Sequence, residues 1–167
     1  MSHSEIEKAV DALSSCLLSR RWRMATAESC TGGWVAKYCT DRPGSSAWFD
    51  RGYVTYSNES KMELLAVEPA LLARHGAVSE GVARQMAVGA CQSQHVQAAL
   101  AVTGIAGPDG GTVDKPVGTV WFAWHRDHGI PRSECVHFAG DRDSIRRATV
   151  EFALRGMVRY LNDSDSA

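Results

Sequence analysis

The stretch TAESCTGGW, Thr26 to Trp34, gathers several chemically active groups within a few positions. It offers the carboxylate of Glu28, the hydroxyl of Ser29 and the thiol of Cys30, followed by two glycines. The hydroxyl or the thiol could be a nucleophile, and free N–H groups at a helix start favour anions. The spacing matches none of GxGxxG, GxxxxGK[ST] and GxSxG. A plain strand-to-helix turn with Ser29 or Thr31 as the helix cap is the alternative interpretation.

A second group of polar residues stands in YVTYSNESK, where Tyr56, Ser57 and Lys61 fall at the end of an expected strand and in the first turn of a helix. A lysine in a partly apolar pocket can lose its proton and serve as a base that activates a serine. The alternative is a solvated lysine on a short helix, which is the commoner situation for a lysine.

A second glycine-rich loop, TGIAGPDGG, follows the continuous apolar run AALAVT. A tight turn explains the PDGG half of this loop but not the TGIAG half, whose backbone N–H groups could wrap a substrate. The loop lacks the lysine of a phosphate-binding P-loop. If the two strands before the glycine-rich stretches are neighbours, Thr103 faces the same crevice as Ser29.

The motif GDRDSIRR places Arg142 and Arg146 four residues apart, on one face of an expected helix that Asp141 or Asp143 would cap. Two arginines on one face can hold a phosphate. They could equally pair with surface carboxylates.

Other catalytic chemistries receive less support from the sequence. A Cys30 nucleophile needs a histidine partner, and none of the six histidines stands in a glycine-rich motif. Glu28 could be a general base, a helix cap or an ion-pair partner. Neither HExxH nor CxxC occurs, so no metal site is expected.

The elements that must position these residues alternate between helical and strand patterns. They predict one domain over residues 1–167, with an ordered core over about 5–161 and a frayed tail. The expected fold class is α/β: a three-layer α/β/α domain with a mixed sheet of about five strands. The sequence predicts helices over 5–19, 34–39, 58–65 (capped by Asn58), 69–75, 81–93 and 144–161, and strands over 20–29, 49–56, 98–103, 117–125 and 133–138.

Composition narrows the function classes. The chain has 167 residues and a net charge of −1, which disfavours a dedicated nucleic-acid binder. No apolar run approaches the roughly 18 residues that span a bilayer, and the charged N-terminal segment is unlike a signal peptide. The cysteines number five, an odd count, so we expect free thiols and a cytoplasmic protein.

Five motifs in order resemble the CinA C-terminal domain family over about residues 5–161: TAESCTGGWVA, GSSAWFDRGYVTYSNESK, HGAVSE, TGIAGPDGGTVDKPVGTVWFAW and GDRDSIRR. The resemblance implies hydrolysis of the carboxamide of nicotinamide mononucleotide (NMN) to nicotinate mononucleotide and ammonia, in pyridine nucleotide recycling. It also implies a three-layer α/β/α fold, no cofactor or metal, and a homodimer. The expected binding partner is the small nucleotide substrate, not nucleic acid or a membrane.

The resemblance further implies roles for individual residues. Ser29 would be the nucleophile and Lys61 its activating base, with Tyr56 and Thr103 lining the reacting amide. Backbone N–H groups of Cys30, Thr31, Gly32 and Gly33 would form the oxyanion site. The wall of the substrate pocket would consist of Gly104, Ile105, Ala106 and Gly107. The 5′-phosphate would be held by Arg142 and Arg146. Two alternatives remain: a non-catalytic nucleotide-binding regulatory module, and an amidase for a related nucleotide amide.

Overall fold

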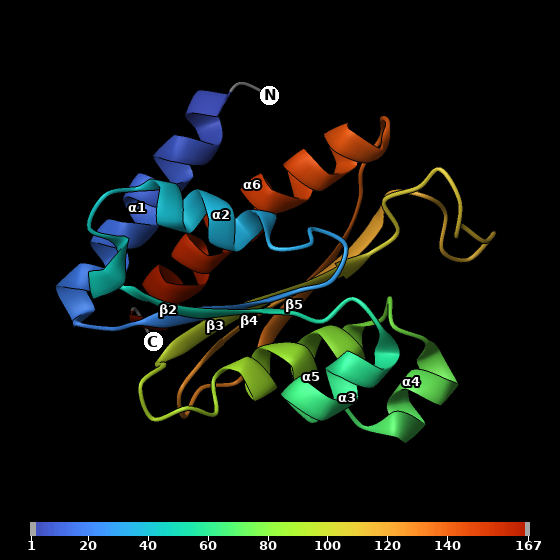
Figure 1. Ribbon diagram of the computed structural model, residues 1–167, viewed down its shortest axis with the longest axis horizontal. Coiled ribbons are helices and arrows are strands. Elements are labelled where there is room, and N and C mark those ends of the chain that lie inside the picture. The colour runs from blue at the N-terminus through green and yellow to red at the C-terminus, as the bar shows by residue number, and fades with distance from the viewer. Residues whose placement is uncertain (1–2, 166–167) are drawn as a thin grey trace.

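The computed structural model of the chain describes residues 3–165 (Figure 1). Residues 1–2 and 166–167, which include the end of the expected tail, lie outside the described residues. The helices are α1 (His3–Arg20), α2 (Trp34–Asp41), α3 (Asn58–Leu65), α4 (Pro69–His75), α5 (Glu80–Ala90) and α6 (Arg142–Asp165), with a short 3-10 turn η1 (Ser45–Ala47). The strands are β1 (Met24–Glu28), β2 (Phe49–Val54), β3 (Ala98–Gly104), β4 (Thr119–Arg126) and β5 (Arg132–His137).

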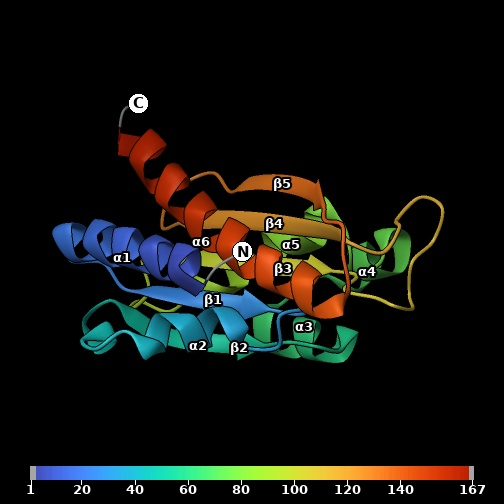
Figure 2. The same cartoon turned by 90° about the horizontal axis from the view of Figure 1, so that it is seen from above.

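The strands form one sheet in the order β2-β1-β3-β4-β5. The pairs β1–β2 and β1–β3 are parallel, whereas β3–β4 and β4–β5 are antiparallel. Helices α1, α2 and α6 lie on one side of the sheet, and α3, α4 and α5 lie on the other (Figures 1 and 2). The predicted three-layer α/β/α architecture with a mixed five-stranded sheet is therefore confirmed.

The two faces of the sheet carry side chains of different size. On the side of α1, α2 and α6, the core contains Met24, Leu100 and Val102. On the side of α5, the central strands present small side chains such as Ala99 and Ala101. Small side chains let a helix approach a sheet closely. All but the last residue of β3 are buried, as its continuous apolar run predicts.

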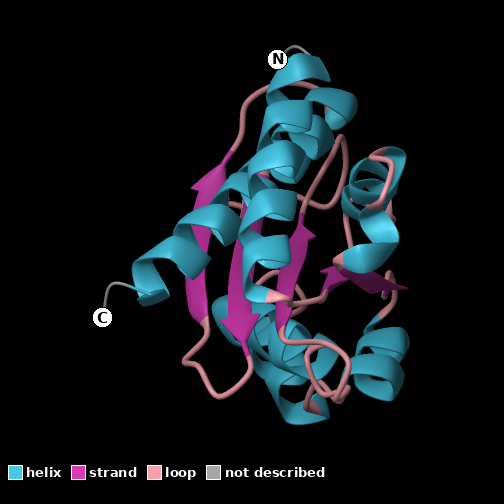
Figure 3. Ribbon diagram, turned by 90° about the vertical axis from the view of Figure 1, so that its left-hand side faces the viewer, coloured by secondary structure: helices cyan, strands magenta, loops and turns pink. Residues whose placement is uncertain are grey.

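The strands β1, β2 and β3 are parallel neighbours, so their carboxyl ends lie together at one edge of the sheet. Figure 3 shows the strands of the sheet in magenta among the helices in cyan. Glu28, the last residue of β1, is paired with Val54 of β2 and Val102 of β3. The pairing continues one residue further, because the N–H of Ser29 donates to the carbonyl of Val102 at 3.1 Å. On the other side, the N–H of Thr55 donates to the carbonyl of Glu28 at 2.9 Å. The chain segments after β1, β2 and β3 therefore start side by side, where open α/β sheets bind ligands.

Several element ends differ from the sequence predictions. The first strand begins at Met24 rather than at residue 20. The last helix begins at Arg142 and continues to Asp165, beyond the predicted end at 161. It starts early because the carboxylate of Asp141 accepts the N–H of Ser144 at 2.9 Å, as an N-cap does. Helix α3 is capped by the hydroxyl of Ser57, not by Asn58.

Candidate active site

Ser29 and Lys61 meet at the shared strand edge. Ser29 follows β1 directly, and Lys61 lies on α3, which begins shortly after β2. The Lys61 Nζ atom lies 3.1 Å from the Ser29 Oγ atom. Lys61 is only 1% exposed and Ser29 only 8%. The solvated lysine that the sequence left open is therefore excluded.

The ammonium end of Lys61 has three polar neighbours. Besides Ser29, the Nζ atom lies 2.7 Å from the carbonyl of Thr55 and 3.4 Å from that of Tyr56. A neutral amine has two N–H groups and one lone pair, so the two carbonyls can accept the hydrogens while the lone pair faces the Ser29 hydroxyl. Burial lowers the pKa of Lys61 below that of an ordinary lysine, which favours this neutral form.

A cavity of about 210 Å³, here named the inner cavity, opens at this pair. It also contacts Thr103 at the end of β3, Tyr56 after β2 and Arg142 at the start of α6. The Thr103 hydroxyl donates to the carbonyl of Ala77 at 2.9 Å. The Arg142 guanidinium donates to the carbonyl of Gly107 at 2.6 Å and to the Tyr56 hydroxyl at 3.3 Å. Four elements distant in sequence thus converge on one cavity.

Two lining residues of the inner cavity, Ala77 and Val78, were not assigned a role from the sequence. They lie between α4 and α5, in the HGAVSE stretch. That stretch is one of the five motifs that resemble the family. Its small apolar residues have no reactive group, so the sequence alone did not indicate a role for them. Their part is to form the wall and to orient the Thr103 hydroxyl.

The turn after Ser29 is held by a buried carboxylate. Glu28 is fully buried, and one of its oxygens accepts the Thr31 hydroxyl at 2.7 Å and the N–H of Val35 at 2.8 Å. Its other oxygen accepts the N–H of Ala36 at 3.0 Å. Glu28 therefore satisfies the free N–H groups at the start of α2. Of the roles left open for Glu28, the structure supports the helix cap, and neither Ser29 nor Thr31 is that cap.

The N–H groups of the turn are not all available to a ligand. The Gly32 N–H donates to the carbonyl of Ser29 at 3.1 Å, closing a four-residue turn. Among the residues that the structure describes, no backbone carbonyl accepts the N–H groups of Cys30 and Thr31. These two amides are the candidates for an oxyanion site beside the Ser29 hydroxyl.

The neighbouring thiol has the wrong ionisation state for a nucleophile. Burial, reinforced by the nearby Glu28 carboxylate, raises the pKa of Cys30 to about 12. The thiolate, which is the reactive form of cysteine, is therefore scarce near neutral pH.

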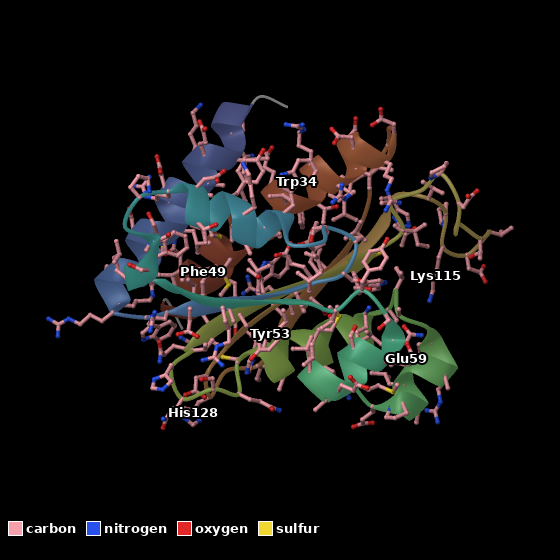
Figure 4. All side chains as sticks on the ribbon, viewed as in Figure 1. Trp34, Phe49, Tyr53, Glu59, Lys115 and His128 are labelled. Atoms are coloured by element: carbon pink, nitrogen blue, oxygen red, sulfur yellow. The ribbon has the colours of Figure 1, made fainter. Side chains whose placement is uncertain are left out.

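The structure places the other predicted binding residues in two locations. A second cavity of about 400 Å³, here named the outer cavity, lies on the other side of the turn. It is lined by Thr31, Gly32, Gly33 and Arg146. Its remaining lining residues are Trp34, Lys37 and Asp143. Figure 4 shows Trp34 at the start of α2, beside α6. The two predicted phosphate-binding arginines, Arg142 and Arg146, therefore face different cavities.

The predicted pocket wall is also divided. Gly104 and Ala106 line the inner cavity, together with Cys30 of the turn. Gly107 contributes its carbonyl to Arg142. Ile105 is not among the lining residues of the inner cavity, and its backbone N–H donates to the carbonyl of Thr119 at 2.9 Å.

Two negative observations apply to the part of the chain that the structure describes. None of its helices combines the length and apolar composition needed to cross a bilayer. Among its described side chains, no group of three or more histidine, cysteine, aspartate or glutamate residues is placed to hold a metal ion.

Comparison with known proteins gives consistent matches over almost the whole chain. The model of the CinA C-terminal domain matches residues 6–161. The chain is 52% identical over 157 residues to the nicotinamide-nucleotide amidohydrolase PncC of Escherichia coli K12, covering 93% of this chain and 94% of that protein. It is 49% identical to a CinA-like protein of Mycobacterium tuberculosis, of which it spans 37%.

Solved structures show the same likeness. The competence/damage inducible protein CihA of Agrobacterium tumefaciens superposes with a TM-score of 0.90 at 42% identity, covering 95% of this chain and 96% of that one. A CinA superfamily protein of Escherichia coli gives a TM-score of 0.90 at 38% identity, covering 96% and 93%.

Proposed function

The chain belongs to the CinA C-terminal domain family, and from that premise we propose that it hydrolyses the carboxamide of NMN to nicotinate mononucleotide and ammonia. The observation that carries the proposal is the buried contact of 3.1 Å between the Lys61 amine and the Ser29 hydroxyl, at the mouth of a cavity. Ser–Lys pairs of this kind perform acyl transfer without a metal or cofactor.

Acylation starts when neutral Lys61 takes the proton of the Ser29 hydroxyl. The Oγ atom attacks the carbonyl carbon of the substrate amide, and the carbonyl oxygen becomes an oxyanion. The N–H groups of Cys30 and Thr31 stabilise that oxyanion, and one such donor is worth about 10²- to 10³-fold in kcat. The Lys61 ammonium returns the proton to the amide nitrogen, the C–N bond breaks, ammonia leaves, and the acyl group of nicotinate mononucleotide remains as an ester on Ser29.

Deacylation repeats these steps with water in place of the serine. Lys61 takes a proton from the water, whose oxygen attacks the ester carbonyl. The Ser29–acyl bond breaks, Lys61 returns the proton to the Ser29 Oγ atom, and nicotinate mononucleotide leaves. One base thus serves both halves of the reaction.

Thr103 distinguishes the amide substrate from the acid product. Its hydroxyl hydrogen is committed to the Ala77 carbonyl, so only its lone pairs face the cavity. A lone pair can accept an N–H of the substrate carboxamide, whereas it repels the oxygens of a carboxylate. Thr103 therefore favours binding of the amide and release of the acid.

Arg142 is the residue that holds the 5′-phosphate. Two of its five N–H donors are committed to Gly107 and Tyr56, which fix the guanidinium at the rim of the inner cavity. Tyr56 is 64% exposed there, where it can contact the ribose or the pyridine ring. Gly104 and Ala106 form the wall beside them.

We also propose that the protein is cytoplasmic and forms a homodimer. All five cysteines are free, which suits a reducing compartment. The homodimer rests on the family resemblance alone, and light scattering on the purified chain tests it: twice the mass of one chain is expected.

The function is tested by incubating the wild-type protein with NMN, nicotinamide riboside, NAD and nicotinamide, and measuring ammonia. We expect NMN to give the highest kcat/KM. Higher turnover of another amide would identify that amide as the substrate. Saturable NMN binding without ammonia release would indicate a non-catalytic nucleotide-binding module.

A further inference from the structure

Arg146 makes contacts that a substrate-binding arginine would not need. From α6, its Nε atom donates to the carbonyl of Cys30 at 3.0 Å, and one of its terminal nitrogens donates to the carbonyl of Thr31 at 3.1 Å. Its guanidinium also lies over the Trp34 ring, with the central carbon 5.1 Å from the ring centroid. The side chain is thus bound to the turn itself, from the side of the outer cavity.

These two bonds fix two successive peptide planes. A trans peptide is planar, and its C=O and N–H groups point in opposite directions. Holding the Cys30 carbonyl toward the outer cavity therefore turns the Thr31 N–H away from it. Holding the Thr31 carbonyl in the same way turns the Gly32 N–H away, toward the Ser29 carbonyl that accepts it.

We infer that Arg146 is a positioning residue for the proposed oxyanion site, acting through the peptide planes at Cys30 and Thr31. This inference rests on the proposed amide hydrolysis, in which the N–H groups of Cys30 and Thr31 stabilise the oxyanion. The bond to the Cys30 carbonyl orients the Thr31 N–H directly. The Cys30 N–H belongs to the preceding peptide plane, whose Ser29 carbonyl is held by the Gly32 N–H. Arg146 itself touches no reacting atom. It supports the turn from the outer side, while the Glu28 carboxylate holds the same turn at the start of α2.

The Thr31 carbonyl also accepts the N–H of Trp34 at 3.0 Å, whereas among the described residues the Cys30 carbonyl is held by Arg146 alone. Gly32 and Gly33 both have left-handed backbone conformations, with φ of 60° and 98°. Glycines adopt such conformations readily but are also the most mobile residues. A Cβ atom added to Gly32 would lie 3.6 Å from a terminal nitrogen of Arg146, so the guanidinium packs directly on this glycine. Arg146 thus provides the rigidity that the glycines lack.

The next residue offers a matched control. The Arg147 guanidinium also lies over the Trp34 ring, at 5.4 Å from the centroid. Its terminal nitrogen pairs with the Asp143 carboxylate at 3.3 Å. Among the described residues it makes no hydrogen bond to the turn. Replacing Arg147 removes a similar charge and the same ring contact, and leaves the two peptide planes held.

The experiment compares Arg146→Ala, Arg146→Lys and Arg147→Ala in steady-state ammonia release from NMN. For Arg146→Ala we expect kcat to fall about 10- to 100-fold, with KM changed less than about twofold, since transition-state stabilisation is lost. Added guanidinium ion should restore part of that kcat. Arg146→Lys should lose nearly as much, because an ammonium cannot reproduce two directed bonds. Arg147→Ala should stay within about twofold of wild type.

A raised KM with unchanged kcat in Arg146→Ala would overturn the inference and return Arg146 to substrate binding. An equal loss in Arg147→Ala would assign the effect to the Trp34 contact instead. Amide hydrogen exchange at Thr31 and Gly32 gives a readout that needs no substrate, and we expect faster exchange in Arg146→Ala and Arg146→Lys than in wild type. Unchanged exchange and unchanged kcat would refute the positioning role alone, whereas a wild type inactive on every amide would refute the proposed function alone.

Discussion

The inner and outer cavities share one wall, the turn from Ser29 to Trp34, yet their contents differ in kind. The inner cavity is the smaller, at about 210 Å³ against about 400 Å³. It contains a buried amine facing a buried hydroxyl. The charges at the outer cavity are already partnered, since Arg146 is bonded to the turn and Lys37 pairs with Asp41 at 2.6 Å. A buried contact between an amine and a hydroxyl, rather than a larger volume, therefore distinguishes the inner side of the turn.

The largest effect is expected at the nucleophile on the inner side. Ser29→Ala removes the proposed nucleophilic atom, so ammonia release from NMN should fall about 10⁴-fold or more. Ser46→Ala, at an exposed serine outside both cavities, is the matched control and should retain wild-type turnover. If Ser29→Ala lost less than about tenfold, the inner cavity would not hold the nucleophile.

The next largest effect is expected at the base. Lys61→Met keeps a buried side chain of similar length but removes the proton acceptor, and should lower kcat about 10³-fold. Lys61→Arg should lose as much, because a guanidinium stays protonated. A loss confined to KM in either variant would make Lys61 a substrate-binding residue.

The pH dependence of wild-type turnover tests the same residue. Protonated Lys61 cannot accept the serine proton, so kcat/KM should rise with pH until Lys61 is neutral. Because burial lowers the pKa of Lys61, the rise should level off below the ~10.4 of a free lysine. A rate that falls over this range, measured where the enzyme stays folded, would contradict the neutral base.

A smaller effect, on KM, is expected at Arg142, the arginine that lines the inner cavity. Arg142→Ala should raise KM for NMN about 10- to 100-fold, the worth of a charged hydrogen bond, and should leave kcat nearly unchanged. Nicotinamide riboside, which lacks the phosphate, should show almost no change in this variant. Equal losses on both substrates would mean that Arg142 shapes the rim through Tyr56 and Gly107 instead of binding phosphate.

The smallest effect is expected on the outer side. Lys37→Ala removes the lysine that lines the outer cavity, whose ammonium already pairs with Asp41. We expect kcat and KM for NMN within about twofold of wild type. A KM increase above tenfold would place the phosphate in the outer cavity and reverse the comparison.

The sequence predicted the order of elements and the fold, because hydrophobic periodicity and glycine punctuation carry that information locally. It also predicted which polar residues lie at strand ends. Ser29 and Thr103 meet because β1 and β3 are parallel neighbours. Helix ends were less well predicted, since Asp141 and Ser57 compete with nearby polar residues for the cap.

The division of the site between two cavities could not be predicted in the same way. Arg142 and Arg146 are one helical turn apart and share a face, so spacing alone treats them as a pair. Their partners come from other segments: Arg142 bonds Gly107, and Arg146 bonds the turn after Ser29. The position of Glu28 likewise allowed three roles, and only the fold of the turn around its carboxylate selects the helix cap.

The central claim is that Ser29, activated by Lys61, carries the acyl group of the substrate amide. The most direct test is peptide mass mapping of the protein after acid quenching during turnover of NMN. We expect a peptide containing Ser29 whose mass is increased by that of nicotinate mononucleotide minus water, and no such peptide in Ser29→Ala. An ester on another residue, or ammonia release by Ser29→Ala at the wild-type rate, would show that Ser29 is not the nucleophile.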